Sequence, residues 1–250
     1  MAEKEQVVKI VQTHPQKVEG YTLVEGFPGI GLIGTIAVGY LAEKQKTEPV
    51  GYIMSRQFPP MASIHKGEPL FPARIYVDHK HKLVLLFSEF VVPASTVYDI
   101  ADQIIAWAQE NKIKRIISLA GMTSREKAGE SEIYGIASTD GMIKDLEKHK
   151  VKVITEGVTT GVSGILMAKC NAIKFPALSL LIETEHGYPD PGAAAELLER
   201  LEKFLGYDIK TADLLGEAKE IEGKMKKMLT QIKLGKMKYQ EAEEKTPMYG

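Results

Sequence analysis

Short apolar segments alternate with helix-forming segments along most of this chain. The apolar segments have the length of strands, and some, such as Ala177–Glu183, are almost continuously apolar. Strands of this kind are buried on both faces, and their alternation with helices indicates a parallel sheet covered on both sides. The predicted fold class is therefore α/β, with a mostly parallel sheet sandwiched by helices.

The pattern gives bounds for each expected element. The expected strands are Tyr21–Glu25, Gly51–Met54, Arg74–Val77, Leu83–Phe90, Ile113–Ala120, Val151–Thr155 and Ala177–Glu183. The expected helices, recognised by apolar residues three and four apart or by their small apolar composition, are Gly31–Lys44, Thr96–Asn111, Asp140–His149, Val162–Ile173 and Pro191–Leu205.

The strand signal stops near residue 207 and divides the chain into three parts. Residues 1–207 are predicted to form the α/β domain, 208–242 a coiled-coil-like helical extension, and 243–250 a flexible tail. The apolar residues of the extension alternate at spacings of four and three, which is a heptad seam. They are Leu214, Ala218, Ile221, Met225, Met228 and Ile232. The seam indicates a homo-oligomer in which this helix packs on a partner helix, and the alternative is a helix that folds back on its own core.

A glycine-rich turn joins the first expected strand to the first expected helix. Its residues are Gly26, Pro28, Gly29, Gly31 and Gly34. They contain the spacing G-x-G-x-x-G, which in dinucleotide enzymes lets a helix N-terminus approach a pyrophosphate. Such sites also carry an acid about 20 residues further on, whereas here that position falls near Arg56 with no acid. We therefore interpret the turn as structural, with small residues that allow close packing of a strand on a helix.

Two carboxyl groups at predicted strand ends leave an enzymatic alternative open. Glu89 and Glu183 lie where parallel strands would border a ligand crevice, and paired carboxyls are common in acid–base catalysis. The alternative function is thus a small-molecule enzyme that binds a nucleotide or nucleoside in the crevice beside the glycine turn. No nucleophile motif or metal-ligand set accompanies these acids, so no catalytic residue, metal site or cofactor is predicted.

The charge balance and the cysteine count narrow the class of partner and the compartment. Lys and Arg total 32 against 33 Asp and Glu, whereas a protein that coats nucleic acid carries a large basic excess. The single cysteine, Cys170, fits a reducing compartment. The first residues are too polar for a signal peptide, and no segment approaches the ~20 apolar residues that span a bilayer. We expect a cytoplasmic protein with no nucleic-acid or membrane partner.

Lysine and glutamate make up most of the charged residues. The chain has 27 lysines and 25 glutamates against 5 arginines and 8 aspartates. This bias is typical of hyperthermophile proteins, so we expect a thermophilic source.

The last three residues of the sequence, Met248-Tyr249-Gly250, follow a proline at the end of the predicted tail. A terminal carboxylate can pair with a lysine in a pocket, while tyrosine adds a rigid aromatic ring with a hydroxyl and methionine adds apolar contact. These three residues are therefore a candidate docking segment for a partner protein.

Seven short segments, taken in their order along the chain, resemble those of a known protein family. They are GFPGIGLIG at 26–34, SEF at 88–90, SLAGM at 118–122, YGIAS at 134–138, GVSGIL at 161–166, LLIET at 180–184 and YPDP at 188–191. On these segments the chain, from about residue 18 to 215, resembles the proteasome assembly chaperone 2 family, and especially its archaeal members. The resemblance implies a compact α/β sandwich and a function other than catalysis, because members bind proteasome α subunits or α rings and help to assemble the 20S core particle.

The resemblance gives the last three residues a specific role. They are similar to the hydrophobic-tyrosine-X (HbYX) tail by which proteasome activators and some assembly chaperones dock between adjacent α subunits. By this similarity, Tyr249 and the carboxylate of Gly250 engage a pocket lysine, and Met248 packs beside them. The prediction is an ATP-independent assembly chaperone or adaptor that binds the 20S α ring as a homo-oligomer, with a tetramer expected and other sizes left open.

Overall fold

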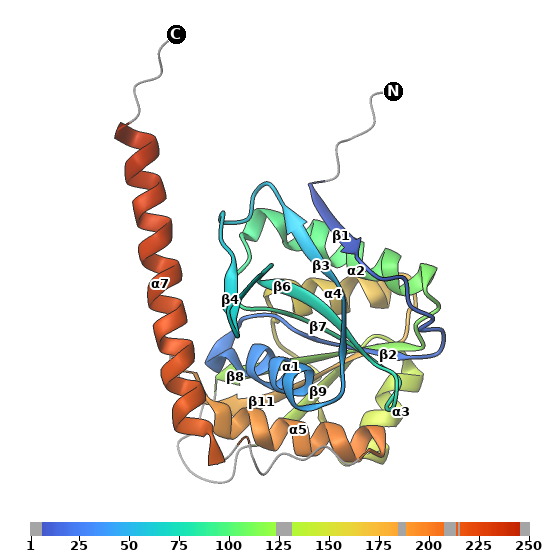
Figure 1. Ribbon diagram of the computed structural model, residues 1–250. Coiled ribbons are helices and arrows are strands. Elements are labelled where there is room, and N and C mark those ends of the chain that lie inside the picture. The colour runs from blue at the N-terminus through green and yellow to red at the C-terminus, as the bar shows by residue number, and fades with distance from the viewer. Residues whose placement is uncertain (1–6, 124–131, 185–188, 208–213, 215, 246–250) are drawn as a thin grey trace, which may run out of the picture.

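The computed structural model describes residues 7–123, 132–184, 189–207, 214 and 216–245. Within these residues a nine-stranded sheet is covered by helices on both faces, and a long C-terminal helix runs along one side of the body and beyond it (Figure 1). The predicted α/β class, with a helical extension, is confirmed.

The elements follow one another in the alternating order that the sequence predicts. The strands of the large sheet are β1 (Val8–Gln12), β2 (Thr22–Gly26), β3 (Glu48–Ser55), β6 (Ala73–Asp78), β7 (Leu83–Ser88), β8 (Arg115–Thr123), β9 (Ile133–Ala137), β10 (Lys152–Val153) and β11 (Ala177–Thr184). A separate hairpin consists of β4 (Ser63–His65) and β5 (Glu68–Leu70). The helices are η1 (Ile30–Leu32), α1 (Ile33–Lys44), η2 (Ala94–Thr96), α2 (Val97–Glu110), α3 (Asp140–Lys148), α4 (Gly161–Ala172), α5 (Pro191–Leu205) and α7 (Ala218–Lys245).

The sheet is parallel at its centre and antiparallel on one arm. Its strand order is β1-β3-β6-β7-β2-β8-β11-β9-β10. The neighbours β7, β2, β8 and β11 run parallel, while β1, β3 and β6 form an antiparallel arm beside β7. The carboxyl ends of the four parallel strands therefore share one edge, which we call the carboxyl edge. Because β6 is antiparallel to β7, with Ala73 opposite Ser88, β6 begins at this edge and β3 ends there.

Two apolar layers hold the sheet, one on each face. Helices α1 and α5 pack on one face against residues such as Val24 and Leu119. Helices α2 and α4 pack on the other face against residues such as Leu23 and Ile116. Successive side chains of a strand point to opposite faces, so Leu23 and Val24 reach different layers. This is the physical reason for the nearly continuous apolar strands.

The sequence pattern missed three features of the sheet. Strand β1 is a five-residue edge strand of mixed polar and apolar residues, and the β4–β5 hairpin is short and half-exposed. Strand β9 lies between β11 and β10 and is antiparallel to β11. Short or edge strands bury little apolar surface, so they leave a weak hydrophobic pattern.

Helix α7 forms most of the predicted C-terminal extension. It runs from Ala218 to Lys245, three residues beyond the predicted end at 242, and residues 246–250 of the predicted tail lie outside the described residues. Its start is tied to α1 by an ion pair of 2.8 Å between Lys44 and Glu217. Within the described part of the chain, no helix combines the length and apolar character needed to cross a bilayer.

Candidate functional site

The glycine turn brings helix α1 into backbone contact with two strands. A Cβ atom built on Gly26 would lie 2.1 Å from the carbonyl oxygen of Gly34, and one on Gly34 would lie 2.2 Å from the carbonyl oxygen of Leu119. Side-chain Cβ atoms essentially never come closer than 3.0 Å to such atoms. Only glycine at both positions allows α1 to cross β2 and β8 at this distance.

The rest of the turn closes the N-terminal end of α1. Gly31 has a φ of +64°, which favours glycine, and its carbonyl accepts a hydrogen bond of 2.8 Å from the backbone N–H of Asp190 at the start of α5. A Cβ on Gly121 would lie 2.4 Å from the carbonyl oxygen of Ile30, so η1 rests directly on the end of β8. Pro28 is half-buried, and Gly29 is exposed and extended with no described atom within 4 Å of an added Cβ. These are packing contacts within the fold, as expected if the small residues of the turn serve to pack a strand closely on a helix.

A buried carboxyl group lies at the end of β2, next to the turn. Glu25 has no exposed surface and faces Ser118 of β8 in register. Among the described residues, neither its carboxyl oxygens nor the Ser118 hydroxyl has a partner with hydrogen-bond geometry. Burial raises the pKa of Glu25 above 4.5, and the nearby hydroxyls of Ser118 and Ser163 oppose the shift without cancelling it.

This burial predicts a pH-dependent stability that a single substitution removes. The raised pKa means that the folded protein keeps a proton that the unfolded chain releases above about pH 4.5. Stability contributed by this group is therefore complete below the unfolded pKa and falls as pH rises through the folded pKa. We expect Glu25→Gln, which imitates the protonated acid, to raise the melting temperature at pH 8 more than at pH 4. Equal shifts of melting temperature at both pH values would contradict the assignment.

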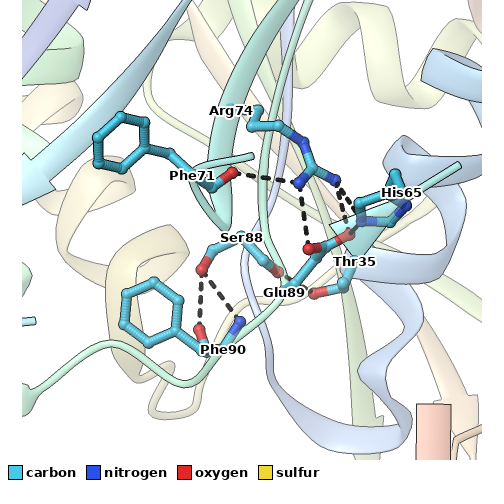
Figure 2. Close-up of polar contacts among 7 residues, drawn as sticks. All are labelled: Thr35, His65, Phe71, Arg74, Ser88, Glu89 and Phe90. Carbon is cyan, nitrogen blue, oxygen red and sulfur yellow. Dashed lines mark hydrogen bonds and ion pairs between the residues drawn. The ribbon is translucent and has the colours of Figure 1, made fainter. Parts of the chain in front are cut away.

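A second buried polar cluster lies at the carboxyl edge (Figure 2). Arg74 of β6 holds Glu89 with two hydrogen bonds, 2.6 Å from Nη2 to Oε1 and 3.2 Å from Nη1 to Oε2. His65 of β4 approaches the same carboxylate, with Nε2 2.8 Å from Oε1. The side chains of Arg74 and Glu89 are only 8% and 7% exposed, whereas His65 is 34% exposed. The cluster joins the β4–β5 hairpin to the end of β7.

Neighbouring polar groups at this edge are also bonded within the fold. The hydroxyl of Thr35 in α1 donates to the carbonyl of Ser88 at 3.0 Å, and the Ser88 hydroxyl donates to the carbonyl of Phe90 at 2.8 Å. Arg74 Nη1 also donates to the carbonyl of Phe71 at 3.1 Å (Figure 2). The polar side chains at the carboxyl edge are thus bonded to one another or to the backbone, and the carboxylate of Glu89 is already paired with Arg74.

The two acids of the enzymatic alternative are not brought together. Glu89 follows β7 and Glu183 lies in β11, and β2 and β8 run between these strands. Neighbouring strands are about 4.8 Å apart, which places the two acids roughly 14 Å from each other. Paired catalytic carboxyls stand closer, at about 5–9.5 Å in glycosidases. Among the residues with described positions, no three His, Cys, Asp or Glu side chains are grouped to hold a metal ion.

The heptad seam of the extension packs largely on the body. Leu214 is fully buried in the core between the sheet and α1 and α5, and Ile221 and Met225 pack against the same core. Ile232 packs against the core on the other face. The side chains of Ala218 and Met228 lie outside the described residues, as do Met248, Tyr249 and Gly250. The four seam residues whose side chains are described therefore pack as expected for a helix that folds back on its own core.

Sequence reasoning missed the buried Glu25 and Arg74 and the half-exposed His65. His65, Arg74 and Glu25 are far apart in the chain or surrounded by apolar residues, and nothing in their local spacing marks them as partners. The one available signal for Glu25 was a charged residue inside an apolar strand, since acids are almost never fully buried without a reason.

Comparison with known proteins places the chain among relatives of similar length. The model of the PAC2 family matches residues 23–229. An uncharacterized protein of Methanocaldococcus jannaschii is 32% identical over 225 residues, which cover 90% of this chain and 92% of the relative.

Solved structures agree with this match. The crystal structure of Pyrococcus furiosus PbaA, described as an archaeal homolog of proteasome-assembly chaperone, is 33% identical with a TM-score of 0.83, covering 92% of this chain and 99% of PbaA. P. furiosus PbaB, described as an archaeal proteasome activator, is 24% identical with a TM-score of 0.75, covering 89% of this chain and 98% of PbaB. The likeness to PbaB is a likeness of fold.

Proposed function

The chain belongs to the PAC2 family, and we propose that it is an ATP-independent proteasome-assembly chaperone that binds the 20S α ring through Met248, Tyr249 and Gly250. The homology to PbaA supports a chaperone-like role, because it extends over 99% of that protein at 33% identity. The proposal assigns the chain no catalytic residue, cofactor or metal, and it places its action in the cytoplasm.

The length and position of helix α7 support docking by the tail. It has 28 residues, and at 1.5 Å per residue it is about 42 Å long. It runs alongside the body and continues past it (Figure 1), so that its last turn lies away from the sheet. A docking segment that follows such a helix is presented at a distance from the body, as insertion into a partner's pocket requires.

Oligomer formation would strengthen a weak contact made by three residues. Several tails on one oligomer that face a ring of repeated pockets gain effective concentration, worth about 10²- to 10⁴-fold in affinity. Leu214, Ile221 and Met225 already pack on the body. We therefore assign contacts between protomers to the part of α7 beyond Ile232, where Leu234 is 52% exposed and the seam spacing continues at Gly235, Tyr239 and Ala242.

Deletion of Met248–Gly250, or the substitution Tyr249→Ala, is expected to abolish co-purification with an archaeal 20S core particle. The reason is that the ring and hydroxyl of Tyr249 and the carboxylate of Gly250 supply the directed contacts with the pocket. A pull-down and a native-gel shift measure the loss.

The matched control is Thr246→Ala, which changes the same segment but keeps the three docking residues. Circular dichroism and light scattering should show the same fold and mass for all variants. Full retention of binding after the deletion would rule out the tail mechanism.

A further inference from the structure

Polar groups from three elements converge beside the first turn of helix α4. Leu23 of β2 and Ile116 of β8 belong to the apolar layer under α2 and α4, and side chains two residues further along a strand point to the same face. Glu25 and Ser118 therefore face this layer too, opposite each other in register. Ser163, in the first turn of α4, brings a further hydroxyl close to the Glu25 carboxyl.

The Glu25 carboxyl and the Ser118 hydroxyl are both enclosed by the fold. Neither side chain is exposed, and in the described part of the chain neither has a partner with hydrogen-bond geometry. Buried polar groups without partners are rare in native proteins and call for an explanation. Burial raises the pKa of Glu25, against the weaker opposing effects of the hydroxyls of Ser118 and Ser163 and the backbone N–H of Phe27.

Uncharged groups surround this carboxyl. The two hydroxyls and the backbone N–H that act on its pKa carry no charge. Its neighbour on β7 is Leu86, and α2 lines the layer with apolar side chains such as Ile100. The ion pair between α2 and α4 joins Asp102 to Lys169, six residues beyond Ser163 along α4. The carboxyl is therefore most stable in its protonated form.

The same turn of α4 offers hydrogen-bond donors to the solvent. Helix α4 has 12 residues, and its N-cap residue, Thr160, makes no side-chain cap hydrogen bond. The first N–H groups of a helix have no partner within it and carry a partial positive charge. Thr159, Thr160 and Gly161 are exposed and Ser163 is half-buried. A dissolved anion thus reaches the turn from outside, whereas Glu25 approaches Ser163 from the buried side.

We infer that the first turn of α4 binds an oxyanion, a sulfate or phosphate group, and that Glu25 controls this binding through the hydroxyl of Ser163. Helix N-termini bind such groups through backbone N–H groups, and a serine hydroxyl donates one hydrogen bond while accepting others. Protonated Glu25 donates to Ser163 and leaves the serine hydrogen for the anion. Ionised Glu25 accepts that hydrogen and adds a like charge, so the anion loses a donor and is repelled.

Proton binding and anion binding are therefore coupled with a definite sign. The anion binds best while Glu25 is protonated, and its affinity falls as pH rises through the raised pKa of the folded protein. By reciprocity, a bound anion favours the protonated acid. This coupling involves neither the docking tail nor the glycine turn, so it is tested separately from the proposed function.

Sulfate is a suitable probe, because its charge stays constant between pH 4 and pH 9. A titration at constant ionic strength, followed by the methyl NMR signals of Val162 in the same turn, gives its dissociation constant. We expect the unmodified chain to bind sulfate at least about threefold more weakly at pH 9 than at pH 4. Glu25→Gln, whose amide keeps a donor at every pH, should bind equally well at both.

Two serine variants locate the site. Ser163→Ala should bind sulfate more weakly at pH 4 and lose most of the pH dependence. The matched control is Ser95→Ala, because Ser95 precedes α2 and its hydroxyl is bonded to Gln57. This control should bind like the unmodified chain. Circular dichroism should show the same fold for all variants.

The remaining outcomes decide the inference. It is overturned if the Val162 signals do not respond to sulfate, if Ser163→Ala binds as tightly as the unmodified chain, or if Glu25→Gln retains the pH dependence. A nucleoside monophosphate, titrated in parallel, identifies the source of the oxyanion. Tighter binding than that of sulfate supports a phosphate ester as the ligand, and equal binding supports a free inorganic anion at the same site.

Discussion

Replacing Gly34 by alanine is expected to destabilise the protein by about 3 kcal/mol or more, at the upper end of the cost of overpacking. Intrinsic propensity argues the other way, since alanine is favoured over glycine inside a helix by about 1 kcal/mol. The contact decides the sign: the new Cβ would lie 2.2 Å from the carbonyl oxygen of Leu119, and backbone cannot rotate away as a side chain can. For a domain of this size the loss corresponds to roughly 6–12 °C in melting temperature.

The control for this experiment lies in the same turn. Gly29 has extended backbone and no described atom within 4 Å of an added Cβ, so Gly29→Ala should leave the melting temperature within a few degrees of the unmodified value. Equal effects of the two substitutions would show that the turn does not act through close packing. Calorimetry on both variants makes the comparison, and thermal shift with added nucleotides tests the crevice alternative on the same samples.

Arg74→Met is expected to cost about 3–5 kcal/mol, because it leaves the carboxylate of Glu89 buried without its cation. That carboxylate is 7% exposed and receives two hydrogen bonds from the guanidinium. The guanidinium carbon also lies 5.1 Å from the centre of the Phe87 ring, a contact that methionine replaces only in part. Chemical denaturation at pH 7 measures the loss.

Two companion variants define the cause. Arg74→Met/Glu89→Leu should be more stable than Arg74→Met alone, because an apolar pair has no buried charge to compensate. His65→Ala should cost much less than Arg74→Met, since His65 is 34% exposed and water can replace its contact. A double variant as unstable as Arg74→Met would mean that packing, and not the unpaired charge, sets the cost.

These two sites explain how the body supports the proposed docking. The glycines at 26 and 34 fix α1 to the central strands, and α1 carries Lys44, which anchors the start of α7 through Glu217. The Arg74–Glu89 pair lies at the carboxyl edge and holds the β4–β5 hairpin through His65. The long helix and the carboxyl edge are therefore both attached to the same sheet.

The local pattern predicted most of the body correctly and the extension only in part. Strands such as β7 and β11 are long and apolar, and α2 has a strong apolar stripe, so their type and approximate bounds were predictable. The heptad spacing correctly predicted a helix after residue 207, but the same spacing fits a partner helix or the protein's own core. The structure places Leu214 and Met225 on the core.

The candidate site was less predictable than the fold. Glu89 was recognised as an acid at a strand end, but its partner Arg74 lies 15 residues away and His65 is 24 residues away. Glu25 and Ser118 face each other only because β2 and β8 are neighbours in the sheet. No spacing rule connects such residues along the chain.

By itself the sequence determined the alternation of elements, the charge balance, the order of the family segments and the identity of the last three residues, because each is a property of residues close together in the chain. Only the tertiary structure decided that β9 is antiparallel to β11, that the buried Glu25 carboxyl has no hydrogen-bond partner among the described residues, that Arg74 neutralises Glu89, and that the body covers Leu214, Ile221 and Met225 of the seam. The physical reason is that periodicity shows which face of an element must leave water. The partner that covers this face is selected by contacts between distant segments.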